Sequence, residues 1–405
     1  MHSKGWRLIQ WFVDSPFKTS IFAPYGVISF GRTMKFTVAL PDLQKALQKV
    51  LPAIPAKSTI PVLEHLHAEL DGGELTFTAT DQEITISLAI SVVGEKNGAL
   101  LIPARQFNDL VKELGSSGSI EVDGNPKTQI ITIRTPTGSY EMKSLDADEF
   151  PSIPPFPDAQ TAQIRKEDMA RMANKTVFAV STEEYRPSMT GVFFQFHGDS
   201  VTAVATDGFR LSRVVVQSDG AAFPTSLEAI VPSRAVDLLR KLDNNVEMAI
   251  SRTHARFSVG SMTITTRIID EKYPPYQNVI PSDNDKTLIV NQREVLSAIK
   301  RVSLFANTNT KHVRFRIEAS SMSVHSEDED SGGKGTENIP CEFTSGAFEV
   351  GFNYRFLEEA IKNITADDDP DLNVKMTFSS PIRAVLITPA AGDDSLLMLV
   401  MPVKI

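Results

Sequence analysis

The sequence predicts an α+β protein built from three similar domains in a row. An apolar helical pattern returns twice, each time after 126 residues, a second helical pattern follows each copy, and short alternating strands surround both. The length of 405 residues suits three domains of roughly 120 to 130 residues better than one. We expect domains at 34–156, 157–283 and 284–405, each with two helices packed on antiparallel sheet.

The first helix of each domain combines an apolar stripe with positive charge. Leu43 and Leu47 belong to this stripe in the first copy, and Met169 and Val295 occupy the position of Leu43 one and two repeats later. Cations recur beside the stripe in each copy, namely Lys45, Lys49, Arg171, Lys175, Lys300 and Arg301. Because they fall off the apolar face, we expect them on an exposed stripe.

The second helix of each domain begins with an arginine, and a lysine follows seven residues later. Seven residues make about two helical turns, so each pair lies along one line of the helix. The pairs are Arg105 with Lys112, Arg234 with Lys241, and Arg355 with Lys362, and Arg240 adds a further cation. A solvated face explains such charge on a single helix. Recurrence in register across three domains favours a shared positive surface instead.

Strands are expected between and after these helices. Turn residues such as Asp71-Gly72-Gly73 predict a hairpin in each domain, and Pro-rich segments at 150–155 and 273–276 are typical of linkers or sheet edges. The hairpins pair 66–70 with 74–79, 192–196 with 201–205, and 313–317 with 322–324. Further strands are expected at 129–133, 255–259 and 384–387.

Composition limits the class of protein. The net charge of −9 argues against a simple nucleic-acid binder, unless the carboxylates that cluster at 146–149, 327–330 and 367–369 lie away from the cationic helices. The single cysteine, Cys341, excludes an internal disulfide and suits a reducing, cytoplasmic location. No apolar run is long enough to span a membrane, so we expect no membrane partner.

Residues 1–33 hold both tryptophans and have no counterpart in the repeat. The short apolar run at 8–13 is not followed by a small-residue cleavage site. We therefore interpret 1–33 as a disordered extension or a start codon placed too far upstream, rather than as a targeting segment.

The sequence contains no catalytic constellation. It has no G-x-x-x-x-G-K-[ST], H-E-x-x-H or G-x-S-x-G motif, and Ser331–Thr336 lacks the spacing of a phosphate-binding loop. His65 and His67 share a strand face but have no third ligand nearby, and the acidic run at 327–330 lacks the alternating ligands of a calcium loop. We expect no cofactor and no metal.

Two segments need an explanation beyond folding. The stretch at 205–212, ATDGFRLS, has a first-domain counterpart, ATDQEI, without the glycine and arginine. The chain also stays apolar to its end, LVMPVKI, which predicts a terminus tied into a sheet or lining a groove. An apolar groove with methionine and one arginine suits an extended peptide.

These segments resemble the bacterial sliding-clamp family, the beta subunits of DNA polymerase III. The resemblance rests on MKFTV at 34–38, ATDGFRLS, YPPY at 273–276, GFN at 351–353 and the terminal VMPVKI, and it spans 34–405. It implies a non-catalytic processivity factor that forms a head-to-tail homodimeric ring of six clamp domains around double-stranded DNA, without sequence preference. The implied partners are the replicative DNA polymerase, the clamp loader and other proteins with a clamp-binding motif.

The resemblance also assigns roles by position. Lys57 and Arg186 join the cations near DNA, and a dimer contact pairs Tyr140 and Met142 with Leu304 and Phe305 of a second copy. Phe209 and Asn278 stand where some family members have histidine and arginine, which bears on peptide selectivity. The implied peptide pocket consists of Met189, Thr206, Gly208, Phe209, Arg210, Leu211, Pro274, Asn278, Val279, Phe356, Ile382, Leu399, Met401, Pro402 and Val403.

Considered without the resemblance, the repeat leaves alternatives open. Head-to-tail contacts give a ring if they close and a filament if they do not. A magnesium-dependent enzyme of nucleic-acid metabolism and a triplicated scaffold without DNA binding are the rival functions. A clamp stays on closed circular DNA and slides off once the circle is cut, whereas neither rival depends on topology in this way.

Overall fold

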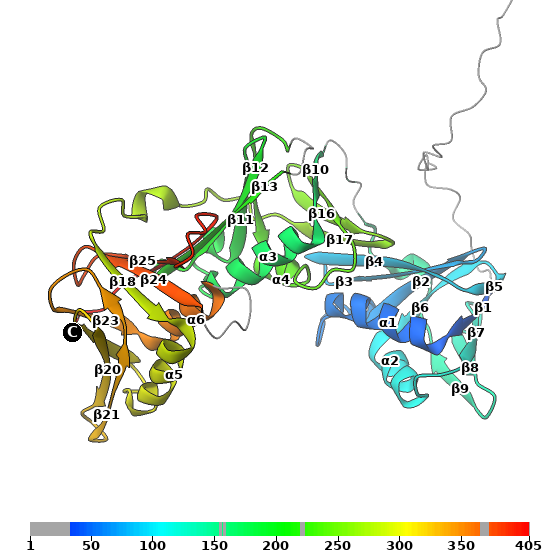
Figure 1. Cartoon of the computed structure of the whole chain (residues 1–405). Helices are drawn as coiled ribbons and strands as arrows, with labels where there is room; N and C mark the ends of the chain where they lie inside the picture. The colour runs from blue at the N-terminus through cyan, green and yellow to red at the C-terminus, as the bar shows by residue number, and fades with distance from the viewer. Residues whose placement is uncertain (1–32, 154–155, 157–158, 219–222, 365–371, 405) are drawn as a thin grey trace, which may run out of the picture.

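The computed structural model describes residues 33–153, 156, 159–218, 223–364 and 372–404. Nearly all of the 1–33 extension and the carboxylates at 367–369 lie outside this range. Three units follow one another in an arc, and the helices of each unit lie on its concave side (Figure 1). None of the described helices is long and apolar enough to cross a membrane.

The first unit contains helices α1 (Leu40–Val50) and α2 (Ala104–Glu113). Its strands are β1 (Met34–Ala39), β2 (His65–Asp71), β3 (Glu74–Thr80), β4 (Ile84–Ser91), β5 (Val93–Lys96), β6 (Gly98–Pro103), β7 (Ser119–Asn125), β8 (Ile130–Arg134) and β9 (Ser139–Lys143).

The second unit contains α3 (Lys166–Thr176) and α4 (Ser233–Asp237). Its strands are β10 (Gln160–Ile164), β11 (Gly191–Phe196), β12 (Ser200–Thr206), β13 (Arg210–Gln217), β14 (Leu227–Pro232), β15 (Val246–Ile250), β16 (His254–Val259) and β17 (Met262–Arg267).

The third unit contains α5 (Gln292–Val302) and α6 (Tyr354–Ile364). Its strands are β18 (Lys286–Asn291), β19 (His312–Ile317), β20 (Ser321–Asp328), β21 (Gly333–Pro340), β22 (Glu342–Phe343), β23 (Phe348–Asn353), β24 (Asn373–Phe378), β25 (Val385–Pro389) and β26 (Leu396–Val400).

Two antiparallel sheets run through the unit boundaries. The order β10-β15-β16-β17-β4-β3-β2-β6 joins the first two units where Met262 pairs with Leu88. The order β14-β11-β12-β13-β26-β25-β24-β18-β22 joins the second and third units where Leu211 pairs with Leu399. Neighbouring units are therefore fused by continuous backbone hydrogen bonding, which the repeat did not predict.

The remaining two sheets lie at the two ends of the arc. Their strand orders are β5-β1-β7-β8-β9 in the first unit and β21-β20-β19-β23 in the third. Strand β9 is thus an edge at one end of the molecule and β21 an edge at the other. Each has one side free for a further strand.

The predicted hairpins are confirmed by the strand pairs β2–β3, β11–β12 and β19–β20. The turns use glycines where the backbone needs positive φ, at Gly72 (59°) and Gly198 (84°). The helices bury the apolar faces expected of them, and Leu43, Leu47 and Val295 are fully buried. The two histidines of β2 have local roles, since His67 packs on Phe150 and His65 contacts the Pro61 carbonyl.

The second helix of the second unit is much shorter than predicted. Helix α4 ends at Asp237, and the amide of Leu239 then bonds to the carbonyl of Val236 in a tighter turn. The Asp-Asn-Asn sequence after Leu242 favours turns over helix because short polar side chains compete for backbone groups. The expected helical line from Arg234 to Lys241 is therefore wrong, and Lys241 lies in a turn.

Candidate functional site

The first candidate site is the cationic surface of the concave side. Helices α1, α2, α5 and α6 turn their apolar faces into the core and leave their cations exposed. Exposed cations predicted from the sequence are Lys45, Lys49, Lys57, Arg105, Lys112, Arg234, Lys241, Lys300, Arg301, Arg355 and Lys362. Positive charge thus gathers in all three units, as the repeat predicted.

Helix α3 departs from this pattern. Lys175 is buried, and its backbone carbonyl accepts a hydrogen bond from the Ser212 hydroxyl. Arg171 is half-buried and donates to Asp393 and to Ser395, both at 2.7 Å. The expected exposed stripe on α3 is wrong because this helix packs on β13 and beside the third unit.

Several of the exposed cations are already neutralised by carboxylates. Lys49 Nζ lies 2.6 Å from Asp243 Oδ2 of the next unit, and Arg234 pairs with Asp81 in the opposite direction. Further pairs join Arg301 to Glu337 and Arg240 to Asp237. No ion pair to another described residue involves Lys45, Lys57, Lys112, Lys241, Lys300, Arg355 or Lys362.

The second candidate site is centred on the turn between β12 and β13. Asp207 Oδ1 accepts hydrogen bonds from the amides of Phe209 (2.9 Å) and Arg210 (3.0 Å), and Gly208 has φ of 90°. Thr206 closes the same turn by donating to the Arg210 carbonyl at 2.7 Å. The rigid turn presents the Phe209 ring, which is 58% exposed.

The Phe209 ring meets the third unit. It stacks on Phe356 of α6 with 6.1 Å between ring centroids and 16° between planes. The backbone carbonyl of Phe209 accepts a hydrogen bond from the amide of Met401 at 2.8 Å, and the amide of Val403 donates to the Gly351 carbonyl at 2.9 Å. The carboxyl-terminal segment is therefore tied into the sheet through β26 and then passes beside Phe209, so the expectation that it is tied into a sheet is confirmed.

The floor below this turn is apolar and the rim is exposed. Leu211 and Leu399 are nearly fully buried in a cluster with Tyr273, which stacks on Phe193 at 4.6 Å. Burial raises the pKa of the Tyr273 hydroxyl, so it stays a neutral donor to the Val204 carbonyl. Val279 (53% exposed) and Ile382 (70% exposed) are the other large apolar side chains of the predicted pocket that face solvent.

Arg210, a predicted pocket residue, has its guanidinium engaged within the chain. Its guanidinium is buried over the rings of Phe356 (4.7 Å) and Phe178 (5.4 Å). It donates to Asp207 Oδ2 at 3.1 Å, to the Phe178 carbonyl at 2.6 Å, and to Glu359 of α6. Each guanidinium nitrogen is thus used within the chain, and Arg210 ties the second unit to the third.

Glu359 and Phe178 are functional candidates that sequence reasoning missed. Glu359 follows Phe356 by three residues on α6, so the two side chains share a helix face, and this spacing was a usable signal. Arg186 was assigned to the DNA surface but lies at the Phe209 turn, since a Cβ on Gly208 would come within 3.2 Å of its Nη1 atom.

The predicted dimer contacts lie at the two ends of the arc. Tyr140 on β9 is 38% exposed, whereas Met142 is buried against the core and offers little contact surface. At the other end Leu304 is 80% exposed and Phe305 44%. The Phe305 ring covers Gly335 of the edge strand β21, where a Cβ would come within 2.7 Å of it.

Three family models match successive parts of the chain. They describe the N-terminal domain of the DNA polymerase III beta subunit at 34–154, its central domain at 163–275 and its C-terminal domain at 277–404. The chain belongs to the DNA polymerase III beta subunit family. The predicted α+β fold with three clamp domains is confirmed.

Similar proteins cover almost the same length. The beta sliding clamp of Bacillus subtilis is 29% identical over 388 residues, 92% of this chain and 100% of that protein. That of Synechococcus elongatus is 27% identical over 384 residues with the same coverage. The crystal structure of the B. subtilis DNA polymerase sliding clamp superposes with a TM-score of 0.84 at 28% identity, covering 92% of this chain and 99% of that one.

A further similar structure carries a ligand. The DnaN sliding clamp of Bartonella birtlesii, bound to griselimycin, has a TM-score of 0.85 at 27% identity and covers 92% of this chain and 100% of that one. Among the residues described for our chain, no three His, Cys, Asp or Glu side chains come together as a metal site would need.

Proposed function

We propose that this chain is a DNA sliding clamp, a non-catalytic processivity factor of the replicative DNA polymerase. The observation that carries the proposal is the layer of exposed cations on helices that line the concave side of a curved molecule. Such cations attract phosphates of any sequence, and long hydrated side chains hold no fixed position on the duplex. The family membership supports the same function.

We propose that two copies close a ring by pairing β9 of one protomer with β21 of the other. Both strands are sheet edges, and joining them removes an exposed edge at each end. Tyr140, Leu304 and Phe305 supply exposed apolar surface beside these edges. The ring then holds six clamp domains, for which we keep the boundaries 34–156, 157–283 and 284–405.

The pocket at the second junction is proposed to bind a short linear motif of partner proteins. Its apolar floor and the exposed Phe209, Val279 and Ile382 fit an extended peptide with large apolar side chains. The replicative polymerase and the clamp loader are the proposed partners. A cytoplasmic location suits a chain with one cysteine.

The function is tested by the topology of the DNA. Protein loaded with a clamp loader onto nicked circular plasmid should remain bound through gel filtration at high salt. Cutting the same plasmid with a restriction enzyme should release it, because retention comes from encirclement rather than from tight contacts. Equal retention on circular and linear DNA would overturn the proposal.

The ring contact gives a second prediction. Leu304→Asp should shift the protein from dimer to monomer, because it places a charge in a closed apolar contact. Sedimentation velocity at micromolar concentration measures this. The control is Val93→Asp, at a residue that is 69% exposed on β5, the other edge of the sheet that ends in β9, and this variant should remain dimeric. A dimeric Leu304→Asp variant would place the contact elsewhere.

A further inference from the structure

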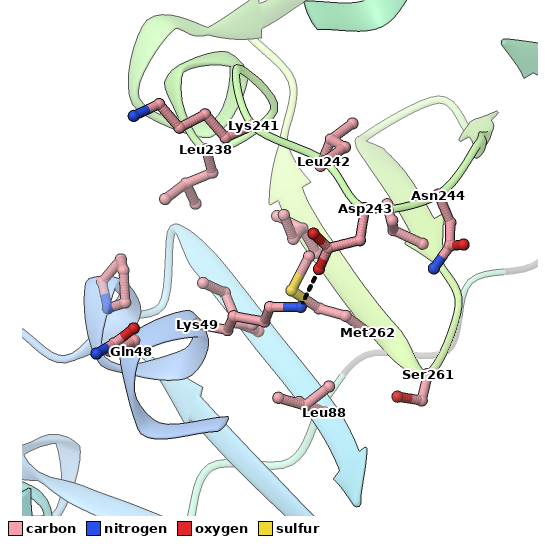
Figure 2. A pocket seen from close by; sticks show the side chains of 14 residues that line it. Gln48, Lys49, Leu88, Leu238, Lys241, Leu242, Asp243, Asn244, Ser261 and Met262 are labelled. Carbon is pink, nitrogen blue, oxygen red and sulfur yellow. Dashed lines mark hydrogen bonds and ion pairs between the residues drawn. The ribbon is translucent and has the colours of Figure 1, made fainter. Parts of the chain in front are cut away.

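The junction between the first two units is open on its inner side. Helix α4 ends at Asp237, whereas its counterpart α6 continues to Ile364 and packs on β26 at the second junction. A cavity of about 230 Å³ remains at the first junction. Lys49 of α1 and Asp243, from the turn after α4, point toward each other across it (Figure 2).

Asp243 is a carboxylate surrounded by lysines. Its hydrogen bond to Lys49 and the charge of Lys49 hold the pKa of the Asp243 carboxyl below its usual value, and the charges of Lys166 and Lys45 lower it further. Lys241 lines the same cavity. This negative charge therefore lies within a positive part of the concave surface.

The Lys49–Asp243 ion pair contributes little to folding. The two side chains are 43% and 72% exposed, and pairs in that setting are weakened by water and salt. The pair also does not close the junction, which β17 and β4 already join by backbone hydrogen bonds. The main effect of the pair is therefore to reduce the positive charge of the concave surface.

We propose that Asp243 is an internal counter-ion that weakens the attraction of this surface for duplex DNA, an inference that rests on the proposed clamp function. A phosphate that approaches Lys49 must displace Asp243, and the displaced carboxylate then repels it. Because Lys49 is already neutralised, DNA binding releases fewer of the cations condensed on the phosphates. The affinity for duplex DNA and its dependence on salt therefore both fall. A clamp that must move along DNA benefits from such loose attraction.

The test compares three variants by fluorescence anisotropy with a short fluorescein-labelled duplex over a range of KCl concentrations. Asp243→Asn should bind roughly three- to tenfold more tightly at low salt. The slope of log K against log[KCl] should steepen by about 0.9 for each Asp243 that faces the duplex. Asp243→Glu keeps the charge and should behave as the parent does.

The matched control is Asp285→Asn, which removes the same charge from a carboxylate of similar exposure. Asp285 precedes β18 and α5 follows that strand, so about 20 Å of strand separates it from the helix. An Asp243→Asn variant with the parent's slope, or an equal gain in Asp285→Asn, refutes the counter-ion role. Equal retention of the parent protein on circular and linear DNA overturns the proposed function itself.

Discussion

Replacing Lys45, Lys112, Lys241 and Lys362 together by alanine is expected to strongly reduce loading onto circular DNA while the protein remains folded and dimeric. These four lysines are exposed and have no ion pair with another described residue, so their charge is available to phosphates. A ring of two subunits loses eight such charges, and we expect the affinity for duplex to fall by roughly a hundredfold or more. Gel filtration of loaded plasmid and thermal unfolding measure both properties.

The control for this prediction removes four exposed lysines that lie off the helices. Lys96, Lys127, Lys272 and Lys375 are exposed and belong to strands or loops. Their replacement changes the net charge equally, so a general charge effect would weaken both variants alike. Unaltered loading and duplex affinity of the concave-surface variant would contradict the assignment of this face to DNA.

Arg210→Ala is expected to loosen the junction between the second and third units by about 3 kcal/mol. Removing one partner of a buried ion pair leaves the other charge unpaired, and Asp207 is only 13% exposed. The Phe178 carbonyl and Glu359 lose a donor at the same time. Amide hydrogen exchange of α6 and β26 should accelerate, whereas that of β2 and β3 should not change.

The same substitution should weaken binding of a peptide with the proposed apolar linear motif, because Phe356 loses the guanidinium that packs on its ring and no longer supports Phe209. Arg383→Ala is the control. Its pair with Asp283 has both side chains more than half exposed and should contribute less than about 1 kcal/mol. If Arg210→Ala lost binding of the motif peptide with normal exchange at α6, Arg210 would serve the peptide directly instead of the junction.

The hairpins and the buried faces of the helices were predictable because the sequence patterns that specify them lie within short segments. Asp71-Gly72-Gly73 provides the positive φ that its hairpin turn needs, and the apolar spacing from Leu43 to Val50 fixes which face of α1 is buried. The exposed cations of α1, α2, α5 and α6 follow from the same spacing. The predicted length of α4 was wrong because its apolar pattern continues to Leu242, past the end of the helix at Asp237, and Asp-Asn-Asn then favours turns.

The partners of charged residues were not predictable in this way. Lys175 and Lys49 occupy equivalent repeat positions, yet Lys175 is buried on a helix that packs on β13, whereas Lys49 is exposed at the first junction. Arg210 was singled out because the first-domain counterpart ATDQEI lacks it, but its contacts with Phe178 and Glu359 involve residues far apart in the sequence.

The sequence alone determined the threefold repeat, the faces of most helices, the hairpins and the family, because each depends on periodicity or on short segments. Only the tertiary structure decided how the units join through β4–β17 and β13–β26, which cations pair with a carboxylate, and which side chains surround Phe209. These features depend on strand pairing and ion pairs between residues tens to hundreds of positions apart, and no local pattern records which partner a strand edge or a charged group meets.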